Sequence, residues 1–167
     1  MHRFIIFIIA GCFFVSGCQQ NQHISVPVDF AVLHMQGPTH ADRGSHHFIR
    51  INPASGGRFL LEQGVRDSII SKETGTHKEV ETILFTKELY SSDILPFICV
   101  LKENNFANMN KRYLNPDIMD GDYKRLLVTG DGQSKNVLLV NRNLKKFSLI
   151  VKSLGQLVGQ SAQKPPN

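Results

Sequence analysis

Apolar residues at every second position predict strands through most of the first half of the chain. Val28, Phe30 and Val32 follow this pattern and predict a strand over about residues 28–36. Further strands are predicted at about residues 46–52, 58–63 and 79–89, with an irregular strand at about 65–72. β-Branched residues favour a strand at 79–89. A helix over residues 77–90 remains the alternative.

Spacings of three and four residues predict a helix over about residues 92–105. Ile94, Phe97, Ile98 and Leu101 fall on one face at this spacing. The preceding Ser91-Ser92-Asp93 provides hydroxyl groups that can cap free amides and an acid that suits the positive end of the helix dipole. A core-facing helix is therefore expected here.

The clearest hairpin lies near the C-terminus, at residues 123–129 and 133–140. Gly130-Asp131-Gly132 joins the two strands and can adopt the positive backbone angles of a tight turn. A last helix follows, and Gly159 ends it. Its apolar stripe consists of Leu144, Phe147, Val151, Leu154 and Val158.

This order of elements predicts an α+β fold, an antiparallel sheet of about five or six strands with two helices packed on one face. We divide the chain into residues 1–17 as a signal segment, 18–27 as a tether, 28–159 as a single domain and 160–167 as a tail. The hydrophobic content of 41% and the charged content of 20% are near globular norms. The 150 residues left after removal of the signal suffice for one core.

The formal charge of +5 is mildly basic, but no run of five basic residues occurs and tryptophan is absent. A nucleic-acid partner is therefore not expected. The charge is compatible with loose attraction to anionic lipid or cell-wall polymer.

The N-terminus begins with Arg3, continues as an unbroken apolar run from Phe4 to Val15, and ends in Ser16-Gly17-Cys18. About a dozen apolar residues are too few to span a bilayer, which needs about 20, but they match the apolar region of a secretory signal. An ordinary secretory signal with an incidental Cys18 is one interpretation, because small residues also suit that cleavage site.

Val15-Ser16-Gly17-Cys18 resembles the lipobox of bacterial lipoproteins. The resemblance covers the first 18 residues and implies cleavage after Gly17, a diacylglycerol thioether on Cys18 and a further acyl chain, such as palmitate, on the new amine. Two or three chains would hold the protein on a membrane, since each buried methylene contributes about 0.8 kcal/mol. Gln19 in place of aspartate implies the periplasmic face of the outer membrane in a diderm host.

Four histidines and an aspartate form the densest group of possible metal ligands. They are His34, His40, Asp42, His46 and His47. Zinc needs three or four converging ligands, and these residues lack a metal-binding spacing such as His-Glu-x-x-His. Adjacent side chains on a strand point to opposite faces. No metal and no cofactor are therefore expected, and solvated loop histidines are the favoured interpretation.

Two other features could be chemical sites, but a structural role is favoured for each. Asp117, Asp120 and Asp122 with Gly121 suggest a calcium loop, but the register fails, so a turn with Asx side chains is favoured. Cys99 is the cysteine that remains after Cys12 and Cys18 are assigned to the signal and the anchor. We expect it to be a small core residue and not a nucleophile.

The order of sheet, helix, hairpin and helix also resembles small uncharacterised lipoprotein domains of bacterial envelopes, which implies no activity. The sequence therefore predicts a lipid-anchored, non-catalytic envelope module that binds an envelope protein or a cell-wall component. One alternative is an envelope hydrolase or metal-dependent enzyme that uses His34, His40, Asp42 and His46. The other is an inhibitor or immunity-type lipoprotein, which would act through loops at 39–45 or 115–122.

Overall fold

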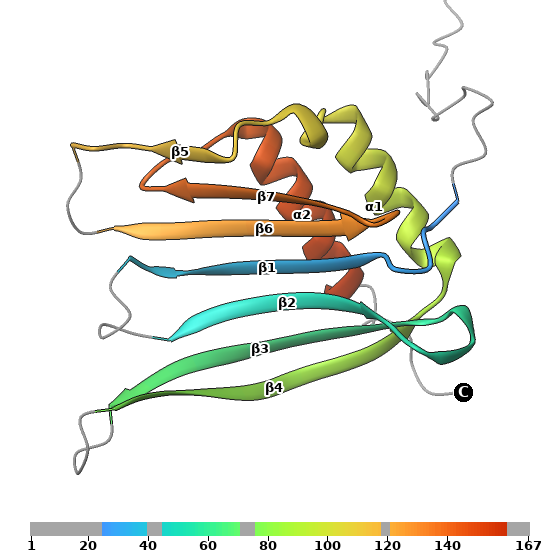
Figure 1. Ribbon diagram of the computed structural model, residues 1–167, viewed down its shortest axis with the longest axis horizontal. Helices are drawn as coiled ribbons and strands as arrows, with labels where there is room; N and C mark the ends of the chain where they lie inside the picture. The colour runs from blue at the N-terminus through green and yellow to red at the C-terminus, as the bar shows by residue number, and fades with distance from the viewer. Residues whose placement is uncertain (1–24, 40–44, 71–75, 118–120, 160–167) are drawn as a thin grey trace, which may run out of the picture.

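The computed structural model describes residues 25–39, 45–70, 76–117 and 121–159 (Figure 1). The strands are β1 (Ala31–Pro38), β2 (His46–Pro53), β3 (Phe59–Ile70), β4 (His77–Leu89), β5 (Arg112–Leu114), β6 (Asp122–Gly130) and β7 (Gln133–Val140). The helices are α1 (Ser91–Glu103) and α2 (Lys145–Gly159), with the short 3-10 turns η2 (Ser55–Gly57) and η3 (Phe106–Asn108).

The strands form one sheet in the order β4-β3-β2-β1-β6-β7-β5. All neighbours are antiparallel except β5 and β7, which are parallel. Both helices lie behind the same face of this sheet (Figure 1). The predicted α+β class is confirmed, and the sheet has seven strands where five or six were expected.

The core lies between the sheet and the two helices, because each contributes one apolar face. Its fully buried members include Ile51, Leu61, Leu89, Ile94, Phe97, Leu126, Val137, Phe147, Ile150 and Leu154. The spacing of Ile94 and Phe97 on α1 places both on the sheet side, as the pattern predicted.

The face of the sheet away from the helices is called the open face here. Ile51 and Leu61 pair in the core, so their neighbours Arg50 and Glu62 lie on the open face. Phe48 is also on the open face, yet it is only 1% exposed. Its ring lies against Gly64 of β3, where an added Cβ would be 2.7 Å from Phe48 Cζ. Close packing therefore occurs on this face also.

The structure differs from the predicted strands at Gly64. The separate strands expected over about 58–63 and 65–72 form one strand, β3, which continues through Gly64, and its register against β4 shifts between Gln63 and Gly64. A bulge absorbs one extra residue and lets a long strand pair continue. The predicted strand over about residues 79–89 is confirmed as β4 (His77–Leu89), and the helical alternative for 77–90 is therefore wrong.

The start of α1 differs from the expected serine cap. Tyr90 is the N-cap residue, and no side-chain hydroxyl caps the helix. Asp93 does act at this end, because its carboxylate accepts a hydrogen bond of 2.8 Å from the Tyr90 amide. The acid therefore satisfies a free amide near the positive end of the helix dipole.

Candidate functional site

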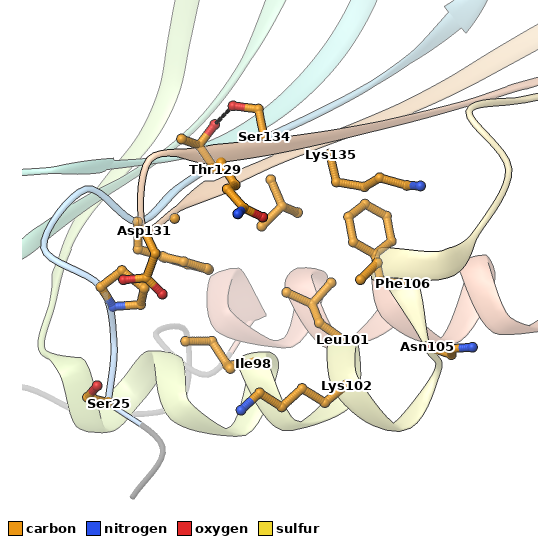
Figure 2. A pocket seen from close by; sticks show the side chains of 16 residues that line it. Ser25, Ile98, Leu101, Lys102, Asn105, Phe106, Thr129, Asp131, Ser134 and Lys135 are labelled. Atoms are coloured by element: carbon orange, nitrogen blue, oxygen red, sulfur yellow. Dashed lines mark hydrogen bonds between the residues drawn. The ribbon is translucent and has the colours of Figure 1, made fainter.

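A groove of about 580 Å³ lies between α1 and the turn end of the β6–β7 hairpin. Its apolar floor consists of Phe30, Ile98, Leu101, Phe106 and Val128. Figure 2 shows these surroundings, with Ile98 and Leu101 on the α1 side and Lys135 on the strand side. The first described residues, Ser25 and Pro27, form part of the wall.

Local conformation explains how the helix side of the groove is built. Ile98 and Leu101 are three residues apart, so both point from α1 toward the cavity. Asn105 follows α1 with a positive φ of 54°, which turns the chain into η3. That turn places Phe106, which is 4% exposed, in the floor beside Leu101.

The end of the groove is fixed by a contact between the N-terminal segment and the hairpin turn. The Asp29 carboxylate accepts hydrogen bonds from the amides of Gly132 (2.7 Å) and Asp131 (2.8 Å). These two bonds hold the pKa of the Asp29 carboxyl below its usual value of 3.8. Asp131 and Gly132 both have positive φ values, as the turn prediction required.

Two lysines flank the floor, Lys102 from α1 and Lys135 from β7. Among the described residues, neither has a carboxylate within 4.0 Å of its ammonium group. Their ammonium groups lie toward opposite ends of the groove (Figure 2). Asp131 is the acidic side chain in the lining, and it is exposed. The groove can therefore hold an apolar body that bears a negative charge.

A second hollow of about 270 Å³ lies on the open face, and its arginines are paired. Arg50 donates to Glu62 at 2.6 Å and to Glu81 at 2.8 Å, and Arg66 donates to Glu81 at 2.5 Å. The hydrogen bond from Arg66 holds the pKa of Glu81 below its usual value, and the bond to Glu62 raises that of Arg50. The charges in this network neutralise one another, so its arginines are less available to a ligand than the lysines of the groove.

The histidines do not converge in the described part of the chain. His34 lies on the helix-covered face and contacts the Phe147 ring, whereas His46 lies on the open face against Tyr123. His47 is exposed. His40 and Asp42 fall outside the described residues. No group of three potential metal ligands occurs among the described residues.

His34 is a buried structural residue and not the solvated loop histidine that was expected. It is 3% exposed, and its Nδ1 lies 3.0 Å from the Arg125 carbonyl oxygen. A carbonyl only accepts, so Nδ1 carries the proton. Burial lowers the pKa of His34 from 6.5, although the bond to Arg125 opposes this shift. The imidazole is therefore neutral at pH 7.

The remaining predicted residues are dispersed. Asp117 and Asp122 are exposed, and Asp120 lies outside the described residues. Cys99 is half-buried on α1 and not in the core.

The anchor residues Gly17 and Cys18 also fall outside the described residues, so the structure leaves the lipobox as a prediction. Among the residues described, no helix combines the length and apolar character needed to cross a membrane.

Sequence reasoning missed the groove. Leu101 was assigned to a core stripe, and no sequence pattern singled out Lys102 or Lys135. No sequence spacing links α1 to β7, so only their packing could bring these side chains together. No protein-family model and no curated protein matches the chain at a significant level.

Proposed function

We propose that this protein is a lipid-anchored, non-catalytic binding module of a bacterial cell envelope that holds its ligand in the groove beside α1. The observation that carries the proposal is the apolar floor flanked by Lys102 and Lys135, which have no carboxylate partner in the described part of the chain. Ligand sites are commonly apolar clefts with a few polar groups that orient the ligand. The described residues around this groove form no nucleophile and base pair.

The anchor hypothesis limits how far the groove can lie from the membrane. In the proposal, cleavage after Gly17 leaves a lipidated Cys18, seven residues before Ser25 in the groove wall. Seven residues span at most about 25 Å. The groove would then lie close to the membrane, on the periplasmic face of the outer membrane in a diderm host.

Site-specific photo-crosslinking in bacterial cells tests both parts together. A photoreactive amino acid replaces Ala107 in the groove or, as a matched control, the exposed Thr86 on β4. Each form is made with Cys18 and with Cys18→Ala, in cells fed a clickable fatty acid.

We expect fatty-acid label only on the Cys18 forms, and a defined adduct only from position 107 of the anchored protein. Equally poor labelling of Cys18 and Cys18→Ala would contradict the anchor. Equal adducts from positions 107 and 86 would contradict the groove as the site.

An inhibitor-type function is the second candidate, favoured by one contact. The Thr39 amide donates to the Gly121 carbonyl at 2.7 Å, so the described ends of the two suspected loops lie together. Thr39→Pro would remove this donor. A tight protein partner captured by the full chain and lost with Thr39→Pro, but kept when Ala107→Arg blocks the groove at an exposed position, would favour this candidate.

A further inference from the structure

We propose that the groove binds a single fatty acid of about a dozen carbons, with its carboxylate held by Lys102 or Lys135. This inference rests on the proposed function and names the ligand of the same site. The apolar floor would receive the chain, and the walls provide the charge.

The volume of the groove suits one chain of this length. A methylene occupies a volume close to that of a water molecule, roughly 30 Å³. Twelve carbons then need roughly 360 Å³, which leaves room for the carboxylate in a groove of about 580 Å³. A phospholipid with two chains of common length would need more than the groove provides. The groove is open to solvent, so its volume fits one chain but does not by itself exclude a lipid with a second chain.

The floor provides an apolar surface of the right kind. Phe30, Ile98, Leu101 and Phe106 belong to the core and are 3%, 7%, 8% and 4% exposed, so each offers a small apolar edge to a ligand. A chain that lies on these residues leaves water without requiring the core to open. Burial of methylenes is the main source of affinity in such a site.

The charged side chains around the groove favour a ligand with a negatively charged headgroup. Arg50, Arg58 and Arg66 on the open face are all paired with glutamates, whereas Lys102 and Lys135 are not paired among the described residues. The Asp29 carboxylate nearby is already engaged by two backbone amides. The ammonium groups lie toward opposite ends, so a carboxylate meets one of them in either orientation of the chain (Figure 2).

The test uses the full chain in phosphatidylcholine nanodiscs with a photoactivatable, clickable 12-carbon fatty acid. Labelled residues are identified by mass spectrometry. We expect label on residues that line the groove. Dodecanoate should compete at least tenfold better than dodecanol, because the alcohol lacks the charge, and dodecyltrimethylammonium should compete no better than dodecanol.

Charge reversal provides the matched variants. Lys102→Glu with Lys135→Glu should reduce labelling at least tenfold. Each single variant should lose less, because the chain can still place its carboxylate at the remaining lysine. Lys146→Glu with Lys152→Glu changes the same charge at exposed positions of α2 and should stay within twofold of the wild type. Unfolding temperatures of all variants should agree, which excludes loss of fold as the cause.

Several outcomes would overturn the inference. Label outside the groove, or equal labelling of the wild type and the double variant at Lys102 and Lys135, would remove the site. Equal competition by dodecanol would show that the groove does not recognise the carboxylate. Tenfold stronger competition by a lysophosphatidylglycerol would show that a phosphate headgroup is preferred to a carboxylate. If fatty acid fails while the crosslinker at Ala107 still forms its adduct, only the ligand class is wrong. If both fail, the proposed function falls as well.

Discussion

The open face of β2, β3 and β4 and the groove beside α1 both carry basic side chains, but they use them differently. On the open face, Arg50 and Arg66 each donate to Glu81 at 2.5–2.8 Å. In the groove, Lys102 and Lys135 have no carboxylate partner among the described residues. The first set of charges contributes to the fold, and the second set is available to a ligand.

The residue types are consistent with this division. The arginine fork donates several directed hydrogen bonds to carboxylates, and Arg50 also lies over the Phe48 ring at 5.2 Å from its centroid. Lysine carries a compact charge on a flexible stem that can follow a ligand. Mutations should therefore affect stability on the open face and binding in the groove.

The largest effect on stability is expected from Gly64→Ala, below the paired arginines. The new Cβ would meet the Thr82 carbonyl oxygen and would lie 2.7 Å from Phe48 Cζ, the ring beneath Arg50. We expect the free energy of unfolding, measured with urea, to fall by about 2–3 kcal/mol. The control Gly155→Ala in α2 meets nothing within 4 Å and should raise stability by about 0.5–1 kcal/mol. An unchanged Gly64→Ala midpoint would contradict this close packing.

Glu81→Ala should have a smaller effect, since it removes one partner from Arg50 and the closest partner from Arg66. We expect a loss of about 1–2 kcal/mol at low salt, and less at high salt because screening weakens the pairs. Glu88→Ala is the control, since its pair with Arg58 is more exposed (57% and 41% against 29% and 23% for Glu81 and Arg66). It should cost less than about 0.5 kcal/mol. Equal losses of stability from Glu81→Ala and Glu88→Ala would show that the network adds nothing beyond a single exposed ion pair.

His34 should give the smallest effect, visible only as a pH dependence. Because burial lowers its folded pKa below 6.5, the unfolded chain binds protons more readily at acid pH. The contribution of His34 to stability is full above pH 6.5 and is lost as pH falls toward the folded pKa. Unfolding of His34→Gln measured at neutral and at mildly acid pH should show a weaker pH dependence than the wild type. The exposed His47→Gln should behave as the wild type, and a flat wild-type profile would contradict the prediction.

Much of the fold could be predicted because local patterns and tertiary packing agree there. The stripe of Ile94, Phe97 and Leu101 marks the buried face of α1, and Asp131-Gly132 forms the expected turn. The three residues of β5 were missed, since so short a strand carries no periodic signal. β3 was divided at Gly64 because a bulge and a strand break look alike in sequence.

The candidate site was less accessible to sequence reasoning. The five possible metal ligands were close in sequence, yet His34 and His46 lie on opposite faces of the sheet. His34 pairs with Ile49, and Ile49 is three positions from His46 on β2, an odd spacing that reverses the face. Conversely, Lys102 and Lys135 are 33 positions apart and line one groove. Closeness in sequence was thus a poor guide to closeness in space.

The amino-acid sequence alone determined the α+β class, the buried stripe of α1, the hairpin turn and the lipobox on which the anchor hypothesis rests. These features depend on local periodicity or on short motifs, which need no partner from elsewhere in the chain. For α2 the sequence pattern found Phe147 and Leu154 but missed the buried Ile150 and Leu157. The tertiary structure decided which charges are neutralised and which line a groove. That outcome depends on the register of seven strands and on the packing of α1 against the hairpin, and these bring together residues that no local pattern connects.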